Sequence, residues 1–148
     1  MELIVKHYSE LTADELYEFL RVRVQVFVVE QHCPYEEVDG RDKQAYHIWL
    51  RDETGIKAYL RVLDRGVSFE EVSIGRVLTT ERGRGLGHKI LDAGIAAARE
   101  KYGAEPIRIE AQTYARKLYE RHGFRQVGDE FLEDDIPHIP MLWTECER

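Results

Sequence analysis

Hydrophobic residues recur along this chain with two periods, and each period predicts one kind of element. Alternation of hydrophobic and other residues is typical of a half-buried strand. It is clearest where Ile56, Ala58 and Leu60 occupy every second position. Segments of this kind predict strands at residues 3–8, 46–51, 56–63, 72–78, 107–111, 124–132 and 138–144.

A first helix is expected near the N-terminus. Thr12 and Glu15 have the spacing of a capping box, which favours a helix beginning there. The helical pattern fades near Gln31. Its predicted apolar face consists of Leu16, Leu20, Val24 and Phe27.

Two further helices are predicted in the second half of the chain. The longer covers residues 88–102 and ends at Gly103, and the shorter covers 113–122 and ends at Gly123. On the longer helix, one face carries Leu91, Ile95, Ala98 and Tyr102.

The order of these elements predicts the fold class. Residues 31–43 are polar and form either a loop or a short additional helix, and residues 52–55 join two strands as a hairpin. No repeat or linker interrupts the pattern. We therefore expect a single mixed α/β domain over residues 1–148, with a sheet flanked by helices.

Composition and charge exclude several classes of protein. The chain is 43% hydrophobic and 33% charged, as expected of a soluble globular protein. No apolar run approaches the roughly 20 residues of a membrane span, and no signal peptide is recognisable, so we expect a cytoplasmic protein with no membrane association. The net charge of −7 disfavours nucleic acid as a partner and mildly favours a cationic one. Cys33 and Cys146 are too isolated for a disulfide framework or a zinc site, and we predict no metal.

A glycine-rich segment, Arg82-Gly83-Arg84-Gly85-Leu86-Gly87, lies between a predicted strand and the long helix. Glycine allows a close approach of backbone N–H groups to a ligand, and a helix N-terminus carries partial positive charge. Two arginines add donors. The segment therefore predicts a phosphate-binding loop, with a simple tight turn as the alternative.

The loop does not match the familiar nucleotide motifs. A P-loop ends in Gly-Lys-Ser/Thr, but His88 follows Gly87 here. A dinucleotide fingerprint beginning at Gly83 would require a third glycine where His88 stands. Glu110 could serve as a ribose-binding acid, but the two closing strands do not fit a doubly wound fold.

The chain instead resembles the GNAT family of acetyl-CoA-dependent N-acetyltransferases. The family's pyrophosphate loop, Q/R-x-x-G-x-G/A, is matched by residues 82–87 at the same place between strand and helix. A second family signature is matched by Ala115, Tyr119, Gly123 and Phe124. Together the two motifs cover roughly residues 71–128.

A closer resemblance is to the ElaA-like branch of the family, and it spans nearly the whole chain. It rests on residues 26–31, Cys33-Pro34-Tyr35 with Asp39, His47, Phe131-Leu132 and Ile136-Pro137-His138. The resemblance implies a mixed, mostly antiparallel sheet splayed between its fourth and fifth strands, with about four flanking helices and the cofactor in the opening.

The resemblance also implies which residues bind acetyl-CoA. Backbone N–H groups of the glycine loop would hold the pyrophosphate, and the Val77 N–H would bind the developing oxyanion. The chain departs from the family at Thr79, where proline is common, and at Gln112, where asparagine is common. The implied contacts are Val77, Leu78, Thr79, Arg82, Gly83, Arg84, Gly85, Leu86, Gly87, His88 and Gln112.

Two catalytic residues follow from the same resemblance. Tyr119 would protonate the leaving thiolate, although ordinary pKa values of ~10 and ~8.5 make that transfer uphill by roughly 2 kcal/mol. The alternative role of Tyr119 is a core aromatic residue. An amine at pH 7 must lose a proton before it attacks. We favour His138 as the base, with His47, Glu71 and Glu110 as alternatives.

The resemblance implies that the acceptor is an amine on a small molecule or peptide, and it is compatible with a homodimer. Acceptor specificity is expected in residues 31–42, where Tyr35, Glu36, Glu37, Asp39 and Asp42 form either an anionic mouth or a solvated acidic loop. Cys33 is either a reactive thiol or a small buried residue. A non-catalytic acyl-CoA-binding sensor or interaction module is the alternative to an enzyme.

Overall fold

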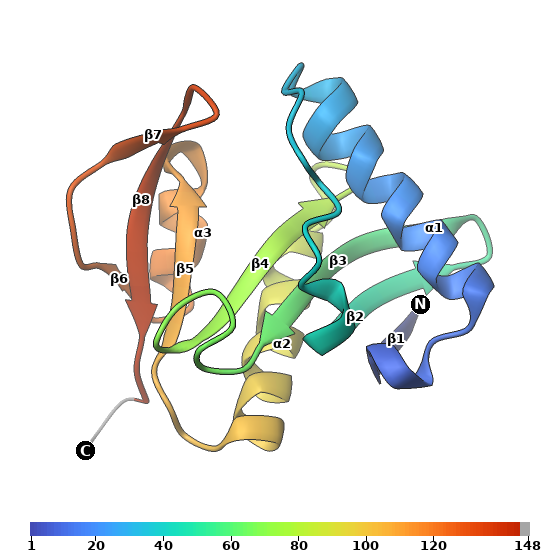
Figure 1. Cartoon of the computed structure of the whole chain (residues 1–148), viewed down its shortest axis with the longest axis horizontal. Helices are drawn as coiled ribbons and strands as arrows, with labels where there is room; N and C mark the ends of the chain where they lie inside the picture. Colours follow the sequence, from blue (N-terminus) through green and yellow to red (C-terminus); the bar gives the residue numbers. More distant parts are fainter. Residues whose placement is uncertain (146–148) are drawn as a thin grey trace.

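The computed structural model describes residues 1–145 and contains one open, mixed sheet of eight strands with helices on both faces (Figure 1). The strand order is β1-β2-β3-β4-β5-β8-β6, and β7 pairs with β8. The strands are β1 (Glu2–His7), β2 (Ala45–Asp52), β3 (Gly55–Leu63), β4 (Val72–Thr79), β5 (Ile107–Gln112), β6 (Phe124–Gln126), β7 (Phe131–Glu133) and β8 (Ile136–Trp143).

The helices follow the predicted positions closely. The α-helices are α1 (Ala13–Val24), α2 (Leu86–Tyr102) and α3 (Arg116–Arg121). Short helical turns are η1 (Tyr8–Glu10), η2 (Gln25–Glu30), η3 (Asp42–Gln44) and η4 (Thr113–Ala115), of which η2 is a π-helix. The segment 31–43 is therefore mostly loop, ending in a single helical turn.

The sheet opens between β4 and β5, as expected. β1 to β4 form an antiparallel meander. β4 and β5 run parallel, but their register contains only the pairs Val72–Ile107 and Ser73–Arg108. Beyond these pairs the two strands diverge, and the gap lies between the two halves of the sheet in Figure 1.

Two hydrophobic cores lie on opposite faces of the sheet. α2 covers one face over a core that includes Leu60 and Met141, whereas α1 covers the other (Figure 1). A Cβ on Gly94 would come within 2.7 Å of Leu60, so this glycine allows α2 to lie directly on β3. The α1 core contains Phe19 and Tyr59.

The capping box of α1 is present, and three residues of the predicted apolar face, Leu16, Leu20 and Phe27, pack against the α1 core. Thr12 Oγ1 accepts from the Glu15 N–H at 3.1 Å. The deepest side chains are Phe19 and Arg23, both with no exposed surface, while Val24 is 37% exposed. The deepest positions of α1 therefore include a charged residue that a hydrophobic pattern does not identify.

The predicted strand at 124–132 is wrong as one element, because the chain forms β6 and β7 with a break between them. At the break, a Cβ on Gly128 would lie 2.8 Å from Pro140, and the Val127 N–H donates to the Pro140 carbonyl at 2.9 Å. Close packing against β8 thus interrupts the strand. Cys146 lies outside the described residues. Between residues 1 and 145, no helix combines the length and hydrophobicity required to cross a membrane.

Candidate active site

A cleft of about 500 Å³ occupies the region where β4 and β5 diverge. β4 and β5 form two walls, and the beginning of α3, the start of β8 and the loop after η2 complete the lining. Among the predicted site residues, the cleft is lined by Val77, Gln112, Tyr119 and His138.

β4 is distorted along the cleft wall. Its register with β3 pairs Gly75 and Leu78 but skips Arg76 and Val77. Arg76 has φ 54°, a left-handed conformation that is uncommon for residues other than glycine. A bulge of this kind redirects backbone groups away from the neighbouring strand. The backbone at Arg76 and Val77 is therefore out of register with β3 at the point where it borders the cleft.

The glycine loop leads directly into α2. Gly83 has φ 76° and Gly85, the residue preceding the helix, has φ 68°, so both occupy a conformation that favours glycine. No side chain caps this helix N-terminus, which leaves its first N–H groups available. Arg82 and Arg84 are exposed beside it, with Arg84 paired to Glu81.

The first turn of α2 packs against α3. A Cβ on Gly87 would lie 3.2 Å from Leu118. At the next residue, His88 Nδ1 and His122 Nε2 lie 2.9 Å apart. The glycine loop and the helix carrying Tyr119 are thereby held together, although residues 82–88 do not line the cleft itself.

The remaining predicted cofactor contacts differ in accessibility. Leu78 is buried in the α1 core and Leu86 in the α2 core. Thr79 is half-buried at the end of β4. Leu78 and Leu86 could therefore meet a cofactor only through their main chains.

Gln112 bridges the cleft by its contact with Gln31. Each amide nitrogen lies 3.4 Å from the other residue's amide oxygen, and 81 residues separate the two positions. The loop after η2 is thus in contact with the end of β5 on the opposite side of the opening.

Tyr119 lies on α3 with 6% of its surface exposed, and it packs edge-on against Phe124 with ring centroids 5.7 Å apart. Burial, with a smaller contribution from Tyr114, raises the pKa of the Tyr119 hydroxyl well above its usual value. The hydroxyl is therefore protonated at neutral pH and can donate a hydrogen bond into the cleft.

His138 has a defined tautomer. Its Nδ1 lies 2.7 Å from the Ile136 carbonyl oxygen, which can only accept, so Nδ1 carries the proton. His138 is 8% exposed, and its ring stacks on that of Phe131 with the ring centroids 5.8 Å apart. Nε2 has no hydrogen-bond partner among the described residues, which leaves its lone pair available in the cleft.

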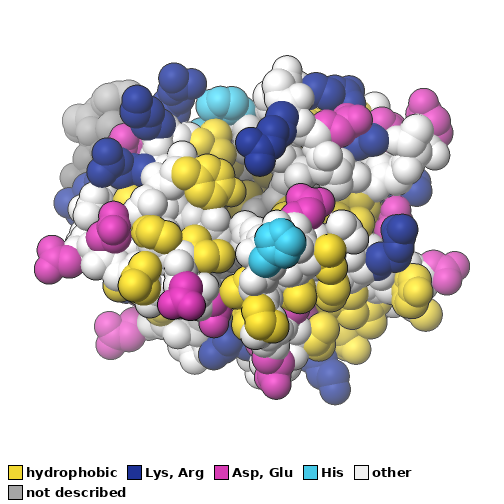
Figure 2. All heavy atoms as spheres, turned by 90° about the horizontal axis from the view of Figure 1, so that it is seen from above, with side chains coloured by type: hydrophobic (Ala, Val, Ile, Leu, Met, Phe, Trp, Pro, Cys, Tyr) yellow, Lys and Arg dark blue, Asp and Glu magenta, His cyan; other side chains and the backbone are white. Residues whose placement is uncertain are grey.

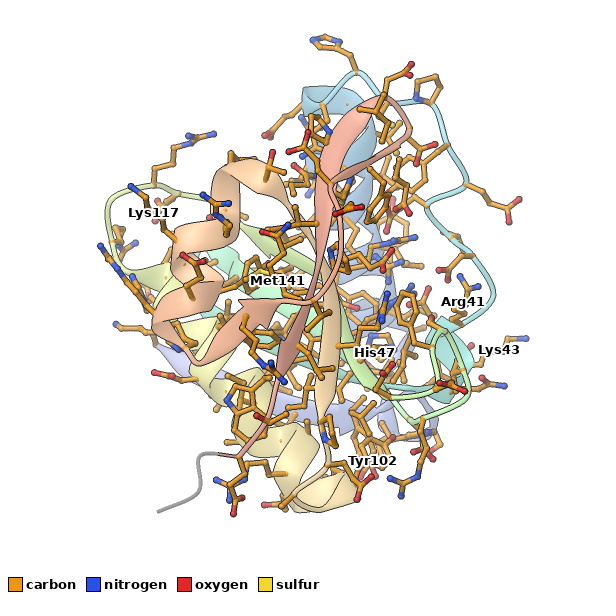
Figure 3. All side chains as sticks on the ribbon, turned by 90° about the vertical axis from the view of Figure 1, so that its left-hand side faces the viewer. Arg41, Lys43, His47, Tyr102, Lys117 and Met141 are labelled. Carbon is orange, nitrogen blue, oxygen red and sulfur yellow. The ribbon has the colours of Figure 1, made fainter. Side chains whose placement is uncertain are left out.

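The other candidate bases are placed less favourably. His47 is fully buried and lies outside the cleft lining, as its position within the protein in Figure 3 illustrates. Its Nε2 donates to the Asp42 carbonyl at 3.0 Å, and its Nδ1 accepts from the Tyr59 hydroxyl at 2.7 Å. Glu110 lines the cleft but pairs with Arg108 at 3.0 Å. Glu71 is half-buried outside the lining.

Most carboxylates of the acidic segment 31–42 form neither an anionic mouth nor a solvated loop, because they lie in a buried ion network, and Glu36 alone of the predicted acidic residues is exposed. The arginines are Arg23, Arg61 and Arg76, and the carboxylates are Glu37, Asp39 and Asp42. Arg23 bonds Glu37 at 2.6 Å and Asp42 at 2.7 Å. Arg61 bonds Asp39 at 2.6 Å and Asp42 at 2.9 Å, and Arg76 bonds Glu37 at 2.8 Å. Equal numbers of opposite charges neutralise the network.

The arginines determine the ionisation of these carboxylates. Burial alone would raise the pKa of Asp39, but hydrogen bonds and the charge of Arg61 hold it far below its usual value. The pKa of Asp42 is lowered in the same way by Arg23 and Arg61. Asp39 and Asp42 therefore stay charged at neutral pH, and their ion pairs position the loop over the α1 face of the sheet.

Sequence reasoning missed these arginines. The one available signal was spacing: Arg23 follows Leu16 and Phe19 at seven and four residues, which places all three on one side of α1. The partners of Arg23 come 14 and 19 residues later, and no local pattern links them to it.

Cys33 is buried, and burial raises the pKa of its thiol. Its Sγ lies 3.9 Å from the Asp134 carbonyl oxygen. The buried, small-residue interpretation of Cys33 therefore fits better than the reactive one. Among residues 1–145, no group of three or more His, Cys, Asp or Glu side chains is arranged to hold a metal ion.

Comparison with known proteins identifies the family. The sequence matches the family described as the acetyltransferase (GNAT) domain over residues 6–145. A UPF0039 protein of Mycobacterium tuberculosis is 46% identical over 138 residues, covering 90% of this chain and 87% of that protein. ElaA of Escherichia coli is 38% identical over 141 residues, covering 91% of each.

Solved structures agree with these matches. An acyl-CoA N-acyltransferase from Pseudomonas aeruginosa has a TM-score of 0.92 and 40% identity, covering 97% of this chain and all 100% of the other. Escherichia coli ElaA has a TM-score of 0.90 and 35% identity, covering 97% of this chain and 99% of the ElaA chain.

Proposed function

Because the chain belongs to the GNAT family of acetyltransferases, in its ElaA-like branch, we propose that it transfers an acetyl group from acetyl-CoA to a primary amine. The amine attacks the thioester directly in a ternary complex, since a thioester is already activated and proximity supplies much of the acceleration. The observation that carries this proposal is the cleft between β4 and β5, which has Tyr119 and His138 on its walls.

The donor binds at the N-terminus of α2. Its uncapped N–H groups and the left-handed Gly83 and Gly85 suit a pyrophosphate, and Arg82 and Arg84 add positive charge. The main chain of Val77 and Thr79 bonds the pantetheine amides as an added strand would. Gln112 contributes a side-chain amide once it separates from Gln31.

The β4 bulge supplies the oxyanion donor. Val77 lines the cleft and is out of register with β3, which is the condition for its N–H to point at a ligand. A preorganised N–H near a developing oxyanion stabilises the tetrahedral intermediate more than it stabilises the planar thioester.

His138 is the general base. Its Nε2 takes a proton from the acceptor ammonium, because Nδ1 is already committed to the Ile136 carbonyl. The neutral amine then attacks the thioester carbonyl carbon. A second proton leaves the nitrogen to solvent as the amide forms.

Tyr119 assists the departure of CoA. As the carbon–sulfur bond breaks, the Tyr119 hydroxyl donates its proton to the sulfur and is reprotonated from solvent. The raised pKa of Tyr119 keeps its hydroxyl protonated, and it also makes proton transfer to the thiolate more uphill than ordinary pKa values would. Reprotonation of Tyr119 from solvent completes the step, because a thiol is the favoured state of free CoA at pH 7.

The direct test is incubation of the purified chain with acetyl-CoA and a panel of primary amines. We expect free thiol and acetylated amine to appear in equal amounts, measured by a thiol reagent and mass spectrometry. Thiol without acetylated amine would indicate hydrolysis. Tight acetyl-CoA binding without turnover of any amine would identify a binding module instead.

A further inference from the structure

The cleft contains carboxylates that the ion network does not neutralise. Among its acidic lining residues, Asp39 pairs with Arg61 and Glu110 pairs with Arg108. The others have no basic group within 4.0 Å among residues 1–145 and are exposed. These three residues, here called the acidic rim, are Glu36, Glu133 and Asp134.

The acidic rim comes from two segments that meet. Glu36 belongs to the loop after η2, and Glu133 and Asp134 belong to the turn between β7 and β8. The contact between Cys33 Sγ and the Asp134 carbonyl joins the two segments. Both lie at the upper end of the molecule in Figure 1, and Figure 2 shows that end with charged groups around exposed hydrophobic side chains.

The cations of the cleft are already engaged. Both Nη atoms of Arg61 bond Asp39 or Asp42, and Arg76 bonds Glu37 and Asp39 through Nε and Nη2. Arg41 pairs with Asp39 at 3.3 Å. A carboxylate on the acceptor would therefore have to displace the protein's own carboxylates from these arginines. A cation on the acceptor would instead meet the unpaired carboxylates of the acidic rim.

A second observation points to a ligand in the same cleft. His138 is more than nine-tenths buried, and its Nε2 lacks a partner although the ring lines the cleft. Phe27, Tyr35 and Phe69 line the same space, but Tyr35 and Phe69 each already have an arginine over the ring, Arg76 and Arg108 respectively. Phe27 can stabilise a further cation through its ring face.

We propose that the acceptor is an amine carrying a second positive charge, such as a diamine or a guanidinium-bearing amine. The reacting amine lies at His138 Nε2, and the second cation lies at the acidic rim. This inference rests on the proposed acetyl transfer and adds the substrate class.

The test compares amines of matched length: putrescine, pentylamine and γ-aminobutyrate. We expect kcat/KM for putrescine to exceed that for pentylamine by about tenfold, and γ-aminobutyrate to be the poorest. Equal turnover of pentylamine, or preference for γ-aminobutyrate, would overturn the acceptor class while leaving acetyl transfer intact. If no amine is turned over, equilibrium dialysis measures the binding of each amine to the protein in the presence of CoA. Tighter binding of putrescine than of pentylamine supports the inference, and equal binding overturns it.

Variants of the acidic rim connect the preference to these residues. The triple variant Glu36→Gln, Glu133→Gln, Asp134→Asn should reduce the preference for putrescine to less than about threefold, with the KM for acetyl-CoA unchanged. Asparagine is chosen at position 134 because φ there is 51°, in the left-handed region that asparagine tolerates well. The control is Glu53→Gln, Asp129→Asn, Glu130→Gln, which changes net charge equally at exposed residues outside the cleft. An equal loss of preference in the control would refute a local role.

Discussion

Arg23 Nε lies 2.6 Å from Glu37 Oε2 inside the protein, and this contact joins α1 to the loop over the cleft. Glu37 Oε2 also accepts from Arg76 Nε at 2.8 Å. The Glu37 carboxylate therefore connects α1, the loop after η2 and the β4 bulge. The shape of the proposed oxyanion site depends on a helix that does not line the cleft.

Replacing Arg23 should strongly destabilise the fold. Arg23→Met leaves Glu37 and Asp42 buried with fewer partners, and removing one member of a buried pair costs about 3–5 kcal/mol. Urea unfolding measures the change. The control is Arg21→Met on the exposed side of α1, which should change stability by less than about 1 kcal/mol. Similar values for the two variants would refute the buried network.

His47 should make the protein less stable in mild acid. Burial, more than any other factor, lowers the pKa of His47 to about 4, below the ordinary value of about 6.5. Between these pH values the unfolded chain binds a proton that the folded chain does not, so acid favours unfolding. The contribution of neutral His47 to the free energy of unfolding is complete above about pH 6.5 and is lost as the pH falls toward 4. The total loss is at most about 3 kcal/mol.

The variant His47→Gln isolates this effect. Its free energy of unfolding, measured in urea from pH 7.5 to 4, should vary less with pH than that of the wild type. His32→Asn, at an exposed histidine with φ 52°, should retain the wild-type dependence. If the free energy of unfolding of His47→Gln depended on pH as steeply as that of the wild type, groups other than His47 would be responsible for the dependence.

The order of strands and helices could be predicted because each element carries a local signal. The capping box at Thr12 and the glycines at 103 and 123 mark helix ends that the structure confirms. The break within 124–132 could not be predicted, because it depends on contact between Gly128 and Pro140. The burial of Arg23 likewise depends on carboxylates remote in sequence.

The glycine loop should tolerate substitution for folding but not for cofactor binding. A Cβ at Gly85 meets nothing within 4 Å, so Gly85→Glu adds only the strain of φ 68° and a negative charge. We expect acetyl-CoA affinity, measured by calorimetry, to become undetectable. The control Gly66→Glu has the same free space and φ 86° in a loop near the opposite, C-terminal end of α2, and it should bind normally. Normal binding by Gly85→Glu would disprove the phosphate site.

Loss of the Tyr119 hydroxyl should slow the release of CoA. For Tyr119→Phe we expect kcat to fall by about 10²–10⁴-fold, typical of removing a general acid, with acetyl-CoA affinity unchanged. Pre-steady-state thiol release measures this step. Tyr17→Phe, at a residue 72% exposed on α1, is the control. A wild-type rate for Tyr119→Phe would leave Tyr119 as a core residue only.

His138→Gln should affect amines according to their basicity. The variant loses the Nε2 lone pair, so ammonium acceptors should react about 10²–10⁴-fold more slowly. A weakly basic amine, already neutral at pH 7, should be acetylated with a much smaller decrease. A purely structural role for His138 would slow both amines equally, and the ratio of their kcat/KM values distinguishes the two roles.

The site was only partly predictable. Tyr119 and His138 were recognised by their resemblance to family motifs, and the structure places both on the cleft. His47 shares the residue type of His138, yet its nitrogens are occupied by Tyr59 and Asp42, which lie in other elements. Residue type identified the candidates, and only tertiary contacts separated them.

The most direct test of the central claim is the thermal midpoint of the protein with acetyl-CoA, CoA, NAD or no ligand. At a hundred times its dissociation constant, a ligand stabilises the folded state by about 2.7 kcal/mol, which corresponds to roughly 5–10 °C for a domain of this size. The account predicts a rise with acetyl-CoA and CoA but none with NAD. No rise with either CoA species would contradict it and leave the glycine loop as a structural turn.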